Sequence, residues 1–191
     1  MKKHYVKQLL FFTLLKASLL SANEYSPSLY GDWIDADKDC QDTRQEVLIE
    51  ESLKPVELDD KGCKVLSGLW LCPYTNRYFT DPSLLDIDHL VPLAEAHRSG
   101  ADTWDREKRK AYANDLELKN ALIAVYRGAN RSKKSRTPVD WMPENKGYWC
   151  EYLKGWVRVK TKWNLSYSTE EQAKIKEMNF GLSNLLSLTC L

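Results

Sequence analysis

Apolar and polar residues alternate along this chain in short blocks, which predicts a fold built from small strands and helices. Residues 121–125 form an apolar run that is too short for a helix and is typical of a buried strand. Residues 85–91 form a short apolar stretch with acidic and histidine positions, closed by Pro92, which predicts a second strand. Residues 56–58 and 63–71 flank the turn-forming residues 59–62 and predict a hairpin.

Helix signals lie on both sides of these strands. Thr43 and Glu46 have the spacing of a capping box, which predicts a helix from residue 43 to about residue 53. Residues 93–98 and 104–112 predict two short helices, and aromatic residues at helical spacing in 149–163 predict a helix with a buried face. A second capping box, Ser168 with Glu171, precedes a final helix. Its expected apolar side consists of Ile175, Met178, Leu182 and Leu185.

The first 22 residues have the order of a secretory signal peptide. Lysines come first, an apolar run of about 12 residues follows, and Ser21 and Ala22 end the segment. A membrane span needs about 20 apolar residues, so we expect cleavage near Ala22, export to the periplasm or the medium, and no membrane association afterwards. Lys16 interrupts the apolar run and favours the alternative, an ordinary N-terminal helix.

Composition indicates one globular domain. Its net charge is small, so a polyanion would have to bind at a local basic patch. The 191 residues are 43% hydrophobic and 29% charged. The formal charge is +1, and loss of the four leader lysines makes the remainder −3. Residues 32–60 hold eleven acids and three bases, whereas residues 127–136 hold five bases and no acid. A charge run is usually a solvated face, so this basic run gains meaning only beside an active site.

The five cysteines favour disulfides over a structural zinc site. No CxxC pair is present, and few histidines are available to complete a zinc site. We expect one or two disulfides with one cysteine left over, in a pairing that spacing does not determine. Cys63 and Cys72 lie on what reads as one extended stretch with opposite orientations, so we expect them not to pair.

His89 and His97 are the histidines that remain after leader removal, so the acid–base chemistry has few candidates. Strand alternation places Asp86 and Asp88 on one face and His89 on the other. A neutral imidazole can deprotonate water, and Asp and Asn oxygens suit a hard divalent cation. A lone histidine beside a strand is more often structural. The strand at 121–125, followed by Asn130 and a basic run, changes that balance.

Eight segments in order resemble the HNH superfamily, in particular the secreted group related to the C-terminal domain of the GmrSD restriction enzyme. The resemblance extends from about residue 30 to residue 165. The segments are residues 31–46, 62–68, 86–93, 98–101, 112–115, 124–125, 130–133 and 141–143.

The resemblance implies an α+β fold with a ββα-metal core (HNH, His-Me finger) at about 84–145. An N-terminal helix and hairpin and two C-terminal helices complete a single domain, 23–191. It also implies an exported, metal-dependent endonuclease that hydrolyses DNA, with RNA as a second substrate and little sequence specificity. No protein partner is expected to be required. The implied cofactor is one divalent ion, Mg²⁺ first and Mn²⁺ second.

Residue roles follow from the same resemblance. His89 is the expected general base, and Asp88 and Asn130 are the expected metal ligands. Asn114 is the favoured middle asparagine that orients the loop or the base, with Asn120 as the alternative. Asp86 and Asn120 are also supporting candidates. The residues expected to contact phosphate are Arg98, Arg131, Lys133 and Lys134.

Two other functions remain open at this point: a catalytically inactive HNH-fold binding module and a phosphodiesterase of small esters. His97 stands where the group has an aromatic residue and is expected to pack rather than react. Asp35, Asp37 and Asp39 have the spacing of calcium ligands, but Cys40 occupies the position where an EF-hand loop needs glycine. We therefore expect these acids to serve the start of the following helix.

Overall fold

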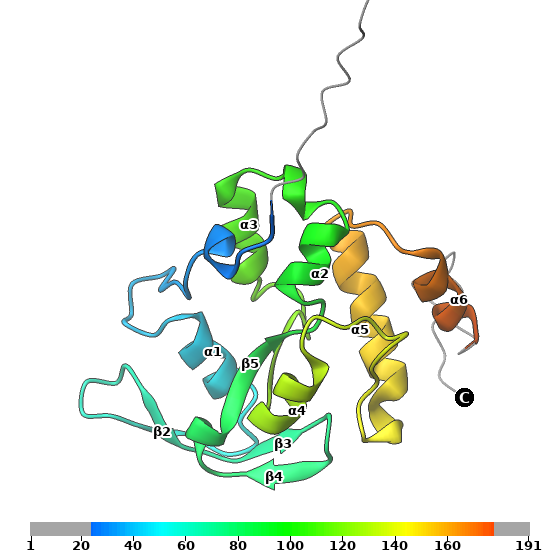
Figure 1. The fold of residues 1–191 in the computed structure, drawn as a ribbon. Coiled ribbons are helices and arrows are strands. Elements are labelled where there is room, and N and C mark those ends of the chain that lie inside the picture. The colour runs from blue at the N-terminus through cyan, green and yellow to red at the C-terminus, as the bar shows by residue number, and fades with distance from the viewer. Residues whose placement is uncertain (1–23, 178–191) are drawn as a thin grey trace, which may run out of the picture.

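The computed structural model describes residues 24–177, which form six α-helices and three two-stranded antiparallel sheets, one of which, β5–β6, is central (Figure 1). The expected leader and three of the apolar positions expected on the last helix, Met178, Leu182 and Leu185, lie outside these residues. Within 24–177, none of the helices combines the length and apolar character that crossing a membrane requires.

The strands pair two by two, and the first two pairs are hairpins. β1 (Glu57–Leu58) pairs with β2 (Val65–Ser67), and β3 (Trp70–Cys72) pairs with β4 (Arg77–Phe79). The expected continuous strand over 63–71 is therefore wrong: the chain breaks at Gly68, where a Cβ atom would lie 2.6 Å from the Trp70 ring. The third sheet joins β5 (Leu85–His89) to β6 (Leu122–Tyr126), with Asp88 opposite Ile123.

The helices lie close to where the sequence predicts them. They are α1 (Thr43–Glu50), α2 (Leu93–Arg98), α3 (Arg106–Ala113), α4 (Arg127–Lys133), α5 (Trp149–Lys162) and α6 (Thr169–Glu177), with four short 3₁₀ turns at Pro27–Tyr30, Pro82–Leu84, Ala101–Thr103 and Lys146–Tyr148. The N-cap of α1 is Asp42, which accepts from the Gln45 backbone N–H, rather than Thr43. The second capping box is confirmed: Ser168 and Glu171 each accept a backbone N–H from the other.

The β5–β6 sheet is buried on both faces. On one face Ile123 and Val125 join the larger core cluster, which includes the α5 residues Tyr152, Leu153 and Trp156. On the other face Leu85, Ile87, Leu122 and Ala124 pack against Val47 and Leu48 of α1 and against Trp70. The aromatic stripe of α5 is therefore core, and the central sheet is held between two apolar layers.

One disulfide fastens the N-terminal region. Cys40, in the loop before α1, is bonded to Cys63, which follows the turn between β1 and β2. Cys72 is a buried free thiol, which confirms that Cys63 and Cys72 do not pair. The acidic loop is thus tied covalently to the first hairpin.

The free edge of β6 is covered by Glu51, whose carboxylate accepts the Ala124 backbone N–H at 2.8 Å. Burial raises the pKa of this carboxyl to about 7. Because the folded pKa exceeds the ordinary value, the folded state binds the extra proton, and stability is lost as the pH rises through about 7. Glu51→Gln keeps the hydrogen-bond acceptor and removes the charge. It should raise the unfolding free energy by about 1–2 kcal/mol at pH 8 and change it little at pH 4.

Urea denaturation at the two pH values measures this effect, with exposed Glu144→Gln as the matched control. An equal gain for Glu51→Gln at both pH values would contradict this account of the buried carboxyl.

Candidate active site

The β5 strand presents its functional side chains in two directions. Asp86 and Asp88 face α4, where Asn130 and Lys133 bond to them, and His89 faces the opposite side with Leu85 and Ile87. This division is the one that strand alternation predicts. His89 is the last residue of the strand, so its ring lies where the sheet ends. His89, Asp88 and Asn130 therefore line one cavity of about 430 Å³.

The His89 imidazole is fixed by a backbone carbonyl. Its Nε2 lies 2.8 Å from the Ala113 carbonyl oxygen at the end of α3. A carbonyl oxygen can only accept, so this bond assigns the proton to Nε2 and leaves a lone pair on Nδ1. Burial lowers the pKa of His89, while the Ala113 hydrogen bond and Asp88 oppose that shift. The ring is therefore favoured in its neutral, proton-accepting form.

Two aromatic rings lie nearly parallel to the imidazole. The Trp33 ring is stacked on it with centroids 5.2 Å apart and planes 14° apart. The Tyr112 centroid lies at 6.3 Å with planes 13° apart. Sequence reasoning missed both contacts, although Trp33 lies in the segment that carries the resemblance.

Asp88 belongs to a buried charge network. Its carboxylate is paired with the Lys133 ammonium at 2.9 Å and accepts the Tyr74 hydroxyl at 2.6 Å. The same ammonium donates to the His89 carbonyl at 2.9 Å. Burial raises the pKa of Tyr74 well above its ordinary value, so its hydroxyl stays protonated and donates to Asp88. Lys133 therefore joins α4 to the end of β5.

This network corrects the expectation that Lys133 contacts phosphate. Its side chain is fully buried, and its ammonium donates to the Asp88 carboxylate and to the His89 carbonyl. Arg98, Arg131 and Lys134 do lie on the surface, and Arg98 and Lys134 line the same cavity as His89. Arg98 is held in place by Glu95 at 2.8 Å and by the Ser135 carbonyl at 2.7 Å.

Asp86 supports Asn130. The Asn130 Nδ2 donates to the Asp86 carboxylate at 3.2 Å, which fixes the amide and leaves its carbonyl oxygen as an acceptor. Asp88, although paired with Lys133, has further lone pairs and lines the cavity. One carboxylate and one amide oxygen are ligands that suit Mg²⁺ or Mn²⁺ with several retained waters. The residues present therefore fit a hard divalent ion.

Asn114 is engaged entirely within the protein. Its Oδ1 accepts from the Ile34 backbone N–H at 3.1 Å and from the Thr43 hydroxyl at 2.7 Å, and its Nδ2 donates to the Lys110 carbonyl at 2.9 Å. Because it follows Ala113, it can act on His89 only through the backbone. These bonds hold the segment around Ile34 and the end of α3 together, so Asn114 is a positioning residue.

Asn120 has a different place. It adopts a left-handed conformation, φ 69°, two residues before β6 begins. Asparagine is one of the few residues that tolerate this region, so the turn accounts for its presence.

His97 is a packing residue, as expected. Its ring is 5% exposed and lies edge-on to Tyr25 and Tyr30, with centroids 5.7 and 6.4 Å away. It does not line the cavity that contains His89.

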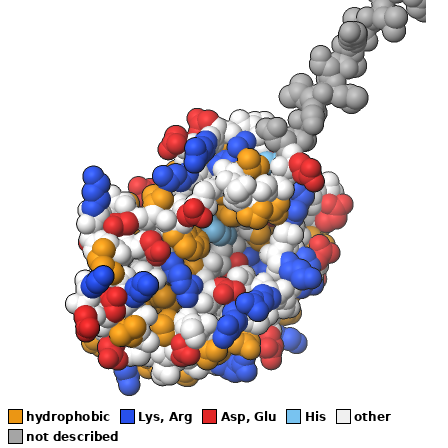
Figure 2. All heavy atoms as spheres, turned by 60° about the vertical axis from the view of Figure 1, so that its left-hand side comes forward, with side chains coloured by type: hydrophobic (Ala, Val, Ile, Leu, Met, Phe, Trp, Pro, Cys, Tyr) orange, Lys and Arg blue, Asp and Glu red, His pale blue; other side chains and the backbone are white. Residues whose placement is uncertain are grey.

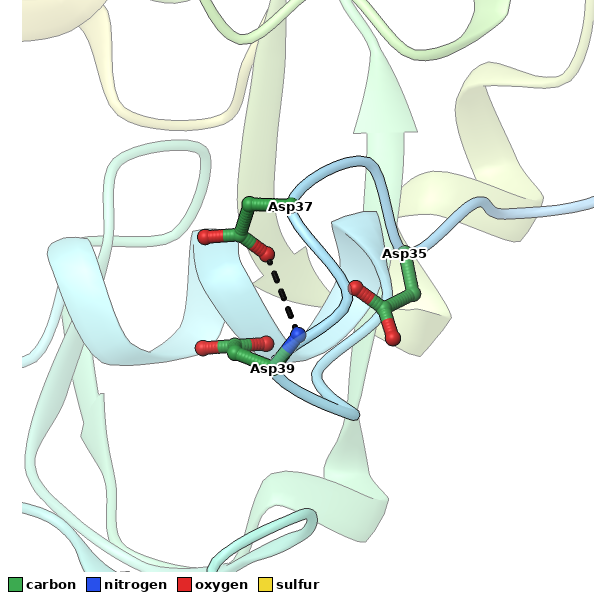
Figure 3. Close-up of side chains that lie close together, drawn as sticks. All are labelled: Asp35, Asp37 and Asp39. Atoms are coloured by element: carbon green, nitrogen blue, oxygen red, sulfur yellow. Dashed lines mark hydrogen bonds between the residues drawn. The ribbon is translucent and has the colours of Figure 1, made fainter.

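The acidic loop, residues 35–41, is held by hydrogen bonds from its own backbone to its aspartates (Figure 3). Oxygens of Asp35, Asp37 and Asp39 lie within 4.8 Å of one another on the surface. Each carboxylate accepts backbone N–H groups of the same loop, such as the bond from Asp39 to Asp37 drawn in Figure 3. These bonds explain the repeated acids through the loop's own conformation.

Comparison with known proteins agrees with the sequence resemblance. Residues 39–178 match the model of the C-terminal domain of GmrSD restriction endonucleases. The chain is also 36% identical over 154 residues to an uncharacterized secreted protein of Arthroderma benhamiae, a match that covers 81% of this chain and 74% of that protein. No solved structure matches the chain. The chain therefore belongs to the family of GmrSD restriction endonuclease C-terminal domains.

Proposed function

We propose that this chain is an exported, metal-dependent endonuclease of the HNH type that hydrolyses DNA, with RNA as a second substrate and little sequence preference. One observation carries the proposal: the Ala113 carbonyl fixes the Nε2 proton of His89, in a cavity that Asp88 and Asn130 also line. The order β5, β6, α4 is that of a ββα-metal core, and the family is one of nucleases.

In this mechanism His89 is the general base. Its Nδ1 accepts a proton from water as the water oxygen attacks phosphorus, the bond from phosphorus to the 3′ oxygen breaks, and the departing 3′ oxygen takes a proton from solvent water. The products carry a 5′-phosphate and a 3′-hydroxyl. Arg98 and Lys134 supply positive charge along the cavity, where phosphate oxygens would lie. Figure 2 shows a histidine side chain inside a hollow with Lys and Arg side chains nearby.

A divalent ion, when bound, would offset negative charge on the phosphorane and the leaving oxygen. Asp88 and Asn130 would hold it, and Asp86 would orient the Asn130 amide. Lys133 would keep the Asp88 carboxylate in place from the buried side.

Plasmid cleavage tests the proposal. Residues 23–191 are incubated with supercoiled plasmid, single-stranded DNA and RNA in Mg²⁺ or Mn²⁺, with EDTA in parallel. We expect nicking and linearisation that EDTA abolishes. Binding without cleavage by the folded protein would favour the inactive module, and turnover of a small chromogenic diester alone would favour the phosphodiesterase.

Asn130→Ala should raise the metal concentration needed for half-maximal cleavage about tenfold or more, because one oxygen ligand is lost. Asn130→Asp retains an oxygen ligand and is the matched variant, expected to bind the ion more tightly than Asn130→Ala. Isothermal titration with Mn²⁺ measures the affinity directly. An unchanged titration in Asn130→Ala would remove this residue from the ligand set.

Replacing Arg131 and Lys134 with glutamine should weaken binding to all DNA sequences alike. The slope of log affinity against log salt should fall in magnitude by about 2, one unit for each lost phosphate contact. Lys61→Gln with Lys64→Gln, also exposed, is the matched control. Fluorescence anisotropy across a salt series measures both slopes, and equal slopes would contradict the phosphate contacts.

A further inference from the structure

Trp33 stacks on His89 and has no role in the proposed mechanism. Its ring centroid lies 5.2 Å from that of the imidazole, closer than the 6.3 Å of Tyr112. Trp33 lies outside residues 39–178, so the family match assigns it no role. It comes from the N-terminal segment, whereas Tyr112 belongs to α3.

The segment around Trp33 is fastened on both sides of it. The Asn114 side chain donates to the Asp32 carbonyl at 3.3 Å and accepts the Ile34 backbone N–H at 3.1 Å. The Thr43 backbone N–H donates to the Ile34 carbonyl at 2.8 Å. The indole also packs against the core cluster that contains Ile87. Asn114 therefore holds the segment that carries Trp33. The residue before it, Ala113, provides the carbonyl that accepts from His89.

We propose that Trp33 is a positioning residue that holds the His89 ring in the orientation set by the Ala113 carbonyl. A flip of the imidazole about its Cβ–Cγ bond would put Cε1 in place of Nε2 at the Ala113 carbonyl, and a tilt would break the 2.8 Å bond. The stacked Trp33 ring, 5.2 Å away, resists both movements. The catalytic consequence rests on the proposed nuclease function, because a misplaced base costs rate.

Cleavage kinetics test this consequence. Trp33→Ala should lower kcat about 10- to 100-fold and change KM less than about threefold, since the indole acts on the base rather than on substrate binding. Trp33→Phe restores a stacking ring and should recover kcat to within about threefold of the parent. Trp149→Ala, at the start of α5, is the control for loss of an indole. A full kcat in folded Trp33→Ala would overturn the proposal.

Imidazole ¹⁵N NMR tests the positioning without any cleavage. The His89 signals, assigned with His89→Ala, should show the neutral Nε2–H tautomer in the parent. In Trp33→Ala they should average between both tautomers, while the His97 signals stay unchanged. A single Nε2–H tautomer that persists in Trp33→Ala would overturn the proposal. If the parent cleaves no substrate, the proposed function fails, and the tautomer comparison still decides the role of Trp33.

Discussion

His89→Ala should lower the rate of DNA cleavage about 10²- to 10⁴-fold, the usual effect of removing a general base. The loss should be in kcat, because the side chain takes the proton of the attacking water and the cavity retains Arg98 and Lys134 for binding. Added imidazole should restore part of the rate, since the deleted ring leaves space beside Trp33 in the cavity.

The pH dependence of the cleavage rate also tests His89 as the general base. Burial lowers the pKa of His89, so the parent rate should rise with pH at values below about 6.5 and be level above it. His97→Phe is the matched control, because that histidine packs among aromatic rings outside the cavity. A parent rate that is flat from pH 4 to 8, or an active His89→Ala, would exclude His89 as the base.

Lys133→Met should destabilise the protein by about 3–5 kcal/mol, because it leaves the Asp88 carboxylate buried without its cation. The double variant Asp88→Asn, Lys133→Met removes both charges and should recover most of that loss. Urea denaturation of the four proteins gives the coupling energy between the two residues. Lys134→Met, the exposed neighbour, should change stability by less than about 0.5 kcal/mol.

A small effect of Lys133→Met would mean that its ammonium reaches solvent and could contact phosphate after all. If Lys133→Met is strongly destabilising and the double variant is equally unstable, the stabilisation comes from the hydrogen bond of Lys133 to the His89 carbonyl rather than from its ion pair with Asp88.

The sequence predicted the two strands of the site, the faces of Asp86, Asp88 and His89, and the helix that follows. It failed at Lys133 for a physical reason. A run of bases reads as a solvated face, but helical spacing places Asn130 and Lys133, three residues apart, on one side of α4. That side covers the two aspartates of β5, so Lys133 is drawn into the interior.

Contacts between distant segments were beyond prediction from patterns. The bond from His89 to Ala113 joins residues 24 positions apart through a main-chain oxygen, which has no sequence signature. The stacking of Trp33 on His89 depends on how the N-terminal loop returns to the sheet. Composition favours such a ring anywhere in the core, so only the three-dimensional arrangement identifies its partner.

The burial of the β5–β6 sheet on both faces limits where this family can vary. A larger or smaller residue on either strand disturbs one of two packed layers, so substitutions there should be poorly tolerated. The turn at residues 59–62 and the loop at residues 137–140 carry none of the proposed site residues and are less constrained. Differences in substrate preference among relatives should therefore accumulate in these connecting segments while the sheet stays nearly constant.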